Sequence, residues 1–572
     1  MSDEEDYVLL GMRPKQPSMP KAFHLPTLNG HDMFEITVSE LQHLFVSGAF
    51  TSKQYTQFCL DRIQQTNPYL EAVIETNPDA LDIADGLDNE RRQGSTRGPL
   101  HGIPVLVKDN MASADRMQTT AGSWALLGCT VPKDAHVVRL LRKAGAVIIG
   151  KANMDEWAGM RGSTYSTGFS ARGGQCRNSY QLTREPSGSS SGSAVSVSAN
   201  IVPLALGTET DTSIIGPAIA NGVVGIKPTV GLTSRGGVIP ISETQDSVGP
   251  FGRTVADAAF ALDVIAGTDE DDRHTKQPGR YQPDSYFAHL ADRHALKGAK
   301  FGVPMKRCWE LAPRPQRAVV EKVLDYIRAA GAEIVLVEMP CAEERIHPDG
   351  HWDWERYGES QPEISEITVS KVETYYLMRE YLSKLENTPM RSLEDIVEYN
   401  DKNSGSEGGH AGDHPAFYDG QDLFRRCVTT QGIKDKTYYA ALKHCQTQCR
   451  TNGIDAALQY KDSRTGESTN LDALLFCDIK MAGQCIAAQA GYPIVAVPVG
   501  LDLDGMPVSL TLQHTAWQEA KLIKWASAIE DLCLHHQGPR ATPTYKDHLR
   551  KNVPVEYAWK YPGAPKWGTS QV

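Results

Sequence analysis

The sequence predicts an α/β protein in which helices cover a β-sheet. Helical patterns and short apolar runs alternate from about residue 134 to residue 265, as in a sheet whose strands are joined by covering helices. The alternation resumes near residue 300 and at residues 332–337. Two further apolar runs, at residues 494–498 and 507–513, predict the closing strands, and a helix is expected after them.

The first hundred residues predict an arm followed by helices. Residues 1–35 are rich in proline and polar groups, so we expect an extended arm over the surface. Thr37 and Glu40 have the spacing of a capping box ahead of an apolar stretch, which predicts the start of a helix. A second helix, expected over residues 52–63, would form a helical hairpin with the first, and a third is expected over residues 78–93.

One predicted strand ends on a lysine. The apolar run after His101-Gly stops at Lys108, and burial at the end of a strand would lower the pKa of this amine. Because the carboxylate of Asp109 would oppose that shift, we expect Asp109 to point elsewhere. The next helix and strand are expected over residues 134–145 and 146–150.

Residues 340–430 interrupt the α/β pattern. They are rich in acidic residues, contain His347, Trp352 and Trp354, and include a glycine-rich loop at residues 405–414. This composition predicts an insertion of helices and loops. We therefore expect one domain over residues 36–545, flanked by the arm of residues 1–35 and a tail of residues 546–572.

The composition is that of a globular protein without a broad nucleic-acid footprint. Of 572 residues, 40% are hydrophobic and 22% charged, and the net charge is −12. The acidic N-terminus is unlike a secretion signal, and no apolar run approaches the roughly 18 residues of a membrane span. The eleven cysteines form no CxxC pair, so we expect mostly reduced, buried thiols and a cytoplasmic location.

Two serines in small-residue loops suggest acyl-transfer chemistry. Ser189 lies in a Ser-Gly run and Ser213 follows the apolar stretch at residues 201–207. Such a run is often a flexible linker, yet a linker does not normally lead directly into a buried strand. A serine needs a nearby base to become a nucleophile, and a neutral buried lysine such as Lys108 can be that base.

At these residues the chain resembles the amidase signature family of serine hydrolases, which use a Ser-cisSer-Lys triad to cleave carboxamides. Residues 187–193 and 207–214 correspond to its two serine-bearing segments. Residues 150–157, 225–235 and 246–250 match its flanking motifs, as do residues 490–493. The resemblance spans roughly residues 36–535, and residues 340–430 are its least certain part.

The resemblance implies a fold and a set of roles. The fold is a large mixed sheet with helices on both faces, and the insertion at residues 340–430 would build the entrance to the active site. Lys108 is the general base, Ser189 the bridging serine after a cis Gly188–Ser189 bond, and Ser213 the acylated nucleophile. The backbone N–H groups that hold the oxyanion belong to Thr210, Asp211, Thr212 and Ser213. No metal or organic cofactor is required.

Several residues depart from the family pattern. Asp211 and Thr212 stand where two glycines are usual, Glu209 where an aspartate is usual, and Ile215 where an arginine is common. A β-branched threonine tolerates positive φ badly, so we expect a reshaped loop or one with ordinary dihedrals. An ionised Asp211 facing the pocket would disfavour an oxyanion.

The leading hypothesis is therefore hydrolysis of a small neutral or hydrophobic amide. One alternative is an acyltransferase or cyclase, in which an amine resolves the acyl-enzyme. Another is a noncatalytic ligand-binding homologue, and a tRNA-dependent amidotransferase subunit is a further family member to consider. The oligomeric state is left open, with a homodimer among the alternatives.

Other residues carry weaker signals. Met160 and Tyr165 precede the serine loop and are candidates for the substrate pocket, although either could be core. Cys445 and Cys449, beside His444, share a helical face and are more readily explained as core than as metal ligands. The pair His410 and His414 is more readily explained as part of a solvated lid, and the serines fit a nucleophile better than Cys176 does.

Overall fold

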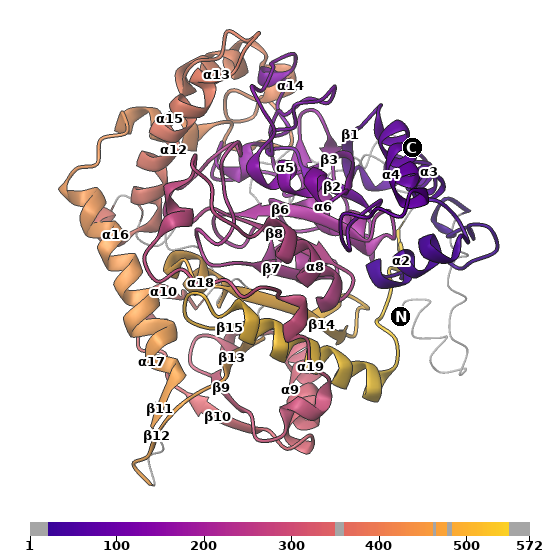
Figure 1. The fold of residues 1–572 in the computed structure, drawn as a ribbon. Coiled ribbons are helices and arrows are strands. Elements are labelled where there is room, and N and C mark those ends of the chain that lie inside the picture. The colour runs from indigo at the N-terminus through magenta and orange to yellow at the C-terminus, as the bar shows by residue number, and fades with distance from the viewer. Residues whose placement is uncertain (1–20, 349–357, 359, 462–464, 478–482, 548–572) are drawn as a thin grey trace, which may run out of the picture.

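An eleven-stranded mixed sheet runs through the part of the chain that the structure describes (Figure 1). The structure is a computed structural model and describes residues 21–348, 358, 360–461, 465–477 and 483–547. Trp352 and Trp354, most of the expected arm and nearly all of the expected tail lie outside these residues.

The strands follow the spatial order β1-β3-β2-β6-β8-β7-β14-β15-β13-β9-β10. In chain order they are β1 (Val73–Thr76), β2 (Pro104–Lys108), β3 (Val147–Ala152), β6 (Leu204–Glu209), β7 (Val224–Lys227), β8 (Ser247–Gly252), β9 (Lys300–Pro304), β10 (Glu333–Val337), β13 (Ala473–Phe476), β14 (Ile494–Leu501) and β15 (Pro507–Gln513). The pairs β2–β3, β2–β6, β9–β10 and β9–β13 are parallel, and the other pairs are antiparallel. Every residue of β2, β3 and β6 is buried, which explains their nearly continuous apolar sequences.

Helices cover both faces of the sheet. Four helices form one row in which each packs against the next and against strands of the sheet. In order along the row they are α5 (His136–Lys143), α8 (Val255–Ile265), α19 (Glu519–Gln537) and α9 (Arg314–Ala329). A second pair, α6 (Ser191–Ser198) and α7 (Ile215–Ala220), also packs against the central strands. The predicted α/β class with a large mixed sheet is confirmed.

The central helix α6 is buried along its whole length because its side chains are small. Its sequence is Ser-Gly-Ser-Ala-Val-Ser-Val-Ser, and every residue is buried. A Cβ atom on Gly192 would lie 2.2 Å from the carbonyl oxygen of Ala72 and 2.4 Å from the amide nitrogen of Asn153. Close approach of the backbone therefore requires glycine here, and it fixes the loop that carries Ser189 against the sheet.

The first helices follow the predicted hairpin. They are α2 (Val38–Ser47), α3 (Ser52–Leu70) and α4 (Ala80–Arg92). Thr37 and Glu40 form the predicted capping box. The second helix continues beyond residue 63 to Leu70, past Pro68, and Thr66 and Leu70 of this extension are buried.

The segment that interrupts the α/β pattern is helical. Its helices are α10 (Ala342–Arg345), α12 (Glu366–Ser383), α13 (Leu393–Lys402), α14 (Ser404–Glu407) and α15 (Asp422–Thr430), followed by α16 (Lys436–Cys449), α17 (Asp455–Leu458) and α18 (Gln484–Ala490). Two short hairpins complete the described elements, β4 (Phe169–Ser170) with β5 (Gly174–Gln175) and β11 (Gln459–Lys461) with β12 (Ser468–Asn470). Figure 1 shows α12, α13 and α15 stacked together beyond the sheet.

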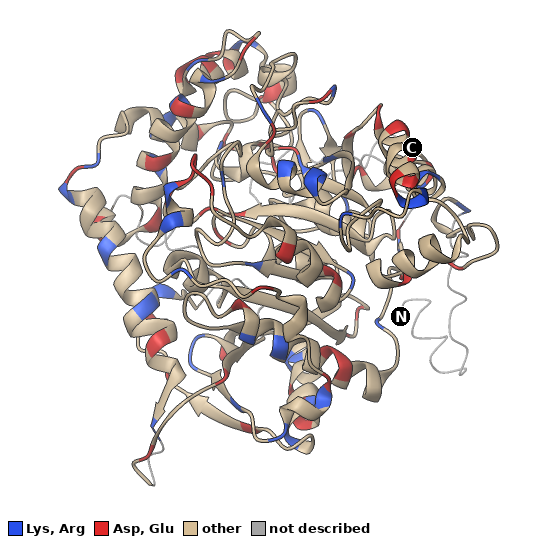
Figure 2. Cartoon of the chain, in the orientation of Figure 1, with Lys and Arg blue, Asp and Glu red and all other residues tan. Residues whose placement is uncertain are grey.

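Charged residues lie mostly on the outer helices and loops, with few on the central strands (Figure 2). Exceptions are Lys108, Lys151 and Lys227, which lie on strands and are fully buried. Within the described residues, no helix combines the length and apolar character needed to cross a membrane. All eleven cysteines are free thiols and ten are buried, as predicted for buried, reduced cysteines.

Candidate active site

The side chain of Lys108 is the centre of a buried polar cluster. Its amine lies 2.7 Å from the hydroxyl oxygen of Ser189 and 3.0 Å from that of Ser190. Thr208 accepts further hydrogen bonds from the amine, at its side-chain oxygen (2.9 Å) and its carbonyl (3.3 Å). The structure therefore brings two of the three predicted triad residues, Lys108 and Ser189, into direct contact.

Burial lowers the pKa of Lys108 to about 7, although the charges of Asp155, Glu209 and Asp246 oppose the shift. Loss of hydration penalises the ammonium form, so a large fraction of the amine is neutral near neutral pH. Asp109 points away, as expected. Its carboxylate accepts hydrogen bonds from Thr120 and Gly122, and Lys151 is the cation that stabilises it.

Ser189 follows a cis peptide bond, Gly188–Ser189, as the family resemblance implied. Its carbonyl accepts a hydrogen bond from the amide of Asp155 at 3.1 Å. A Cβ atom on Gly188 would lie 2.0 Å from a carboxylate oxygen of Asp155, so a side chain at this position would displace that carboxylate. Burial raises the pKa of Asp155 to about 6. Asp155 thus both positions the serine loop and places a charge near Lys108.

Ser213 lies in the neighbouring loop. Its carbonyl accepts a hydrogen bond from the amide of Ser190 at 3.1 Å, so the two serine loops are joined through their backbones. Among the described residues, the Ser213 hydroxyl bonds to the carbonyl of Asp211, at 3.4 Å, rather than to Ser189. The loops are adjacent, but the second hydroxyl contact of the predicted relay is not formed in this structure.

Glu209 organises the backbone after Ser213. One carboxylate oxygen accepts hydrogen bonds from the amides of Ile214 (2.6 Å) and Ile215 (2.9 Å), at the start of α7. Burial raises the pKa of Glu209, and the charge of Lys227 opposes that rise. Lys227 therefore supplies the positive charge near this carboxylate, while Ile215, where the family often has arginine, is buried.

The oxyanion loop keeps a left-handed residue despite its unusual sequence. Thr212 has φ of 61°, which corrects the expectation of ordinary dihedrals at this position. The strain is tolerated because Glu209 and Ser190 fix the residues that follow Thr212, through the amide of Ile214 and the carbonyl of Ser213. Within the described residues, the amides of residues 211–213 have no hydrogen-bond acceptor, unlike those of residues 214–216.

The surroundings of Asp211 favour the protonated form of its carboxyl. Burial raises the pKa of its carboxyl well above the usual range, and the neighbouring carboxyls of Glu366 and Glu209 raise it further. A neutral carboxyl does not repel a developing oxyanion. The departure at residue 211 is therefore compatible with negative charge nearby.

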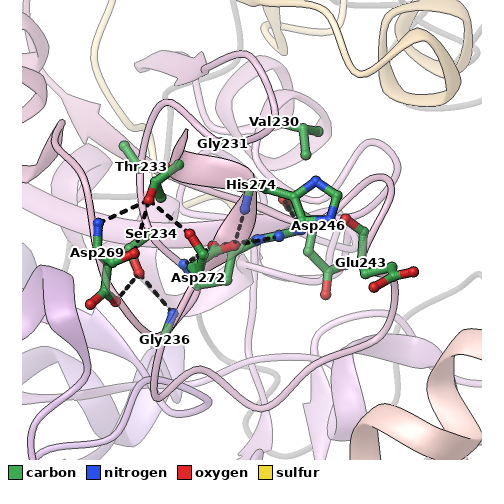
Figure 3. Close-up of polar contacts among 12 residues, drawn as sticks. Val230, Gly231, Thr233, Ser234, Gly236, Glu243, Asp246, Asp269, Asp272 and His274 are labelled. Atoms are coloured by element: carbon green, nitrogen blue, oxygen red, sulfur yellow. Dashed lines mark hydrogen bonds and ion pairs between the residues drawn. The ribbon is translucent and has the colours of Figure 1, made fainter. Parts of the chain in front are cut away.

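A second polar cluster supports the start of the oxyanion loop. Thr210 donates a hydrogen bond to Asp246 at 2.6 Å, and the same Asp246 side chain accepts from the amides of Ile241 and Ser242. Arg235 binds the carbonyl of Glu243 and forms a two-point ion pair with Asp272. Figure 3 shows Asp246, Glu243 and Asp272 beside the Ser234–Asp269 contact.

The two residues predicted to line the substrate pocket occupy different places. Met160 lines a small cavity together with Trp157 and Phe424. Tyr165 lies beside Asp155, and its backbone forms an isolated β-bridge with Phe417, just after the glycine-rich loop. Both are near the serine loops, but Met160 alone of the two lines this cavity.

The weaker candidates lie apart from the Lys108 cluster. Cys445 and Cys449 are buried on α16, and burial raises the pKa of Cys176. His414 packs against Phe169 and Phe417, and is thus less solvated than the prediction of a lid suggested. His410 lies 3.4 Å from Asp401.

Sequence reasoning missed Ser190, Thr208, Asp155 and Lys227. Ser190 was visible as the next residue of the serine run, and Thr208 precedes the Glu209 segment. Asp155 and Lys227 lie outside the two serine segments, and folding brings their charges to the site. A search for buried charges at strand ends would have found Lys227.

The fold and the sequence together define an amidase. The family model described as Amidase matches residues 54–349. A structure of native peptide amidase from Stenotrophomonas maltophilia superposes with a TM-score of 0.78 at 40% identity, covering 90% of this chain and 99% of that one.

The chain belongs to the amidase family. A Schizosaccharomyces pombe protein named as an amidase is 46% identical over 93% of this chain and 90% of its own length. An Arabidopsis thaliana protein that is also named as an amidase is 38% identical over 88% of this chain and 91% of its own length.

Proposed function

We propose that this amidase hydrolyses the carboxamide C–N bond of a small neutral or hydrophobic substrate through an acyl-enzyme on Ser213. The observation that carries the proposal is the buried Lys108 amine 2.7 Å from the Ser189 hydroxyl, in the loop bonded to the Ser213 segment. The pKa of about 7 for Lys108 suits a general base near neutral pH.

The first step moves a proton along the two serines. The Ser190 hydroxyl donates a hydrogen bond to the carbonyl of Thr208 at 3.0 Å. Its oxygen therefore accepts the hydrogen bond from the Lys108 amine, and Ser190 takes no part in the relay. The neutral Lys108 amine then takes the Ser189 proton, Ser189 takes the Ser213 proton, and the Ser213 oxygen bonds to the amide carbon. The relay requires the Ser213 hydroxyl to rotate from the Asp211 carbonyl toward Ser189.

The second half of the reaction releases the products. The free amides of residues 211–213, together with the amide of Thr210, would hold the oxyanion. Removing one such donor typically raises the activation barrier by about 3–4 kcal/mol. The Lys108 ammonium returns its proton through Ser189 to the leaving nitrogen, and the C–N bond breaks. Water then attacks the Ser213 ester, giving the carboxylic acid and restoring the serine.

The direct test measures amine release by the purified protein. Wild-type enzyme should release ammonia or amine from small neutral amides. Ser213→Ala should lower kcat/KM by at least about a thousandfold, since removal of a catalytic nucleophile usually costs this much or more. Wild-type activity in Ser213→Ala would refute the proposal.

Two other outcomes would redirect it. If an amine resolves the ester, reactions in ¹⁸O-labelled water with added amine would give an unlabelled amide product, as expected of an acyltransferase or cyclase. If the pocket binds amides without reacting, the protein would be a ligand-binding homologue or an amidotransferase-type subunit. We favour hydrolysis because Lys108 and Ser189 are in contact.

The location and assembly of the enzyme are separate proposals. The reduced, buried cysteines agree with a cytoplasmic location, and the net charge of −12 gives no reason to expect nucleic acid as a partner. Light scattering on the purified protein would distinguish a monomer from a homodimer.

A further inference from the structure

Two buried carboxyl groups meet where the helical insertion contacts the oxyanion loop. Asp211 precedes Thr212 in that loop, and Glu366 is the first residue of α12. Asp211 is 9% exposed and Glu366 is 7% exposed. The carboxyl of Asp211 contacts the carboxyl of Glu366 and the thiol of Cys485. The loop that carries the nucleophile is thus joined to the insertion by a pair of side chains.

The contact between the two carboxyl groups requires a proton. Among the described residues, no N–H or hydroxyl group donates a hydrogen bond to either carboxyl oxygen of Asp211. Two adjacent carboxylates repel each other, whereas one proton between them turns the contact into a hydrogen bond. The pair of Asp211 and Glu366 therefore fits a state with a single shared proton.

The hydrogen bonds around the pair decide which residue keeps the proton. Glu366 accepts from the side-chain amides of Gln245 at 2.7 Å and Gln489 at 3.2 Å. The Gln489 amide is held in this orientation because its oxygen accepts from Arg345 at 2.6 Å. Donors stabilise the ionised form of a carboxyl. Glu366 therefore carries the charge, and Asp211, which has no such donor, keeps the proton.

The other groups around Asp211 favour the same arrangement. Glu209 of β6 is close enough for its negative charge to act on Asp211, so it opposes a second anion there. Lys227 of β7 also interacts with Asp211 through its charge, but its amine donates to the carbonyl of Pro228 at 3.0 Å. Cys485 of α18 offers only a thiol, which is a weak donor.

The pair lies where it can affect the oxyanion. The amides of residues 211–213 have no acceptor among the described residues, and Thr212 has φ of 61°. A side chain anchored at residue 211 fixes the peptide groups that carry these amides. A neutral carboxyl at this position also adds no charge that would repel an oxyanion.

We propose that protonated Asp211 donates a hydrogen bond to ionised Glu366, and that this bond positions the oxyanion loop for the reaction. The inference rests on the proposed function. Both are positioning residues, because their side chains act through the backbone amides of the loop and not on the substrate. The helical insertion then contributes to catalysis through α12, although it carries no residue of the triad.

The first test replaces Asp211 in two ways. Asp211→Leu has a similar size but no donor, so kcat should fall at least about thirtyfold while KM changes less than about threefold. Asp211→Asn keeps an uncharged donor toward Glu366, so its kcat should exceed that of Asp211→Leu at least about tenfold. Equal kcat values for the two variants would overturn the proposal.

A second variant removes the acceptor. Glu366→Gln has one side-chain oxygen for three donors, Gln245, Gln489 and Asp211, and it takes away the charge that holds the proton of Asp211. We expect kcat to fall at least about tenfold, again with little change in KM. Wild-type kcat in Glu366→Gln would overturn the proposal.

The matched control is Glu373→Gln. Glu373 is also a buried carboxyl of α12, but its hydrogen bonds come from Ser242 and Tyr438. This variant should keep kcat within about threefold of wild type. A fall equal to that of Glu366→Gln would show a general effect of changing a buried carboxyl and would overturn the proposal.

Infrared spectroscopy separates the failure of this proposal from the failure of the proposed function. At about pH 8 an ordinary carboxyl is ionised, so the carbonyl absorption of protonated carboxyl groups should be weaker in Asp211→Asn than in wild type. Such a loss without amide turnover by the wild type would support the pair and refute hydrolysis. Turnover with an unchanged absorption would refute the pair alone.

Discussion

At the scale of single residues, the proposed function makes activity depend on the pKa of Lys108. Its amine must be neutral to accept a proton, so kcat/KM should rise with pH through an apparent pKa near 7. The sign follows from the charges: burial favours the neutral form, whereas Asp155 favours the ammonium form.

Replacement of Asp155 should therefore move the acid limb of the pH profile. Asp155 accepts a hydrogen bond from the amide of Gly168 at 2.5 Å. Asp155→Asn removes the negative charge but keeps a side-chain oxygen that can accept this bond. We expect the apparent pKa to fall by about one unit, measured as kcat/KM against pH. Asp109→Asn, next to Lys108 in the chain but close to the charge of Lys151, should leave the acid limb in place. A rise in the apparent pKa of the Asp155→Asn variant would contradict this role of Asp155.

The sequence predicted part of this residue-scale picture. Lys108 was identifiable because an apolar run stops on it, and Ser189 and Ser213 because the motifs of a known family include them. The raised pKa of Asp211 was not predictable, since it comes from burial and from the carboxyl of Glu366, which belongs to the insertion.

At the scale of elements, the start of α7 depends on Glu209. Its carboxylate accepts hydrogen bonds from two backbone amides there. Burial lowers the pKa of Lys227, and Glu209 is the main charge that opposes this shift. The helix that follows Ser213 is therefore held by a buried carboxylate from β6 rather than by a capping side chain of its own.

Replacement of Glu209 by glutamine should destabilise the protein. Glu209→Gln keeps one oxygen for the amides but leaves Lys227 without this charge, so unfolding free energy should fall by about 2–4 kcal/mol. Denaturation by urea measures it. The control is Glu321→Gln, which changes an exposed side chain of α9 paired with Arg317 and should alter the unfolding free energy by less than about 0.5 kcal/mol. Equal effects of the two substitutions would contradict the role of Glu209.

Element boundaries were predictable where local signals were strong. The capping box at Thr37 marks α2, and the buried run ending at Lys108 marks β2. The helices between residues 340 and 430 were less readable because their packing against one another and against the core determines them. The buried Glu373 of α12, for example, accepts hydrogen bonds from the hydroxyls of Ser242 and Tyr438, which lie far away in the sequence.

At the scale of the whole molecule, the two ends of the described chain are joined. Phe23 stacks on Tyr545 with ring centroids 4.1 Å apart, and Arg540 pairs with Glu35 and donates to the carbonyl of Gly222. Burial opposes ionisation of Glu35, but Arg540, Arg253 and Asn200 together outweigh it, so its pKa is lowered.

This junction predicts a pH-dependent stability difference. Arg540→Ala should lower the unfolding free energy by about 1–3 kcal/mol near pH 7. Because the folded pKa of Glu35 lies below its unfolded value, the ion-pair contribution is present above the unfolded pKa and lost as pH falls through the folded one. Urea denaturation of wild-type and variant protein at pH 7 and about pH 3 measures both values; a difference that grows toward acid pH would contradict the assignment.

The α/β class and mixed sheet were predictable because strand and helix patterns alternate along most of the chain. The order of strands was not, since neighbours such as β7 and β14 lie far apart in the sequence. The order β6-β8-β7 brings the charge of Lys227, at the end of β7, close to Glu209, at the end of β6, so the electrostatics of the site depend on topology.

The most direct test of the central claim is to locate the covalent intermediate. Purified enzyme should react with a fluorophosphonate, and peptide mapping by mass spectrometry should find the adduct on Ser213, with none in Ser213→Ala and slower labelling in Lys108→Met. An adduct on another residue, or equal labelling of Ser213→Ala, would contradict the acyl-enzyme on Ser213.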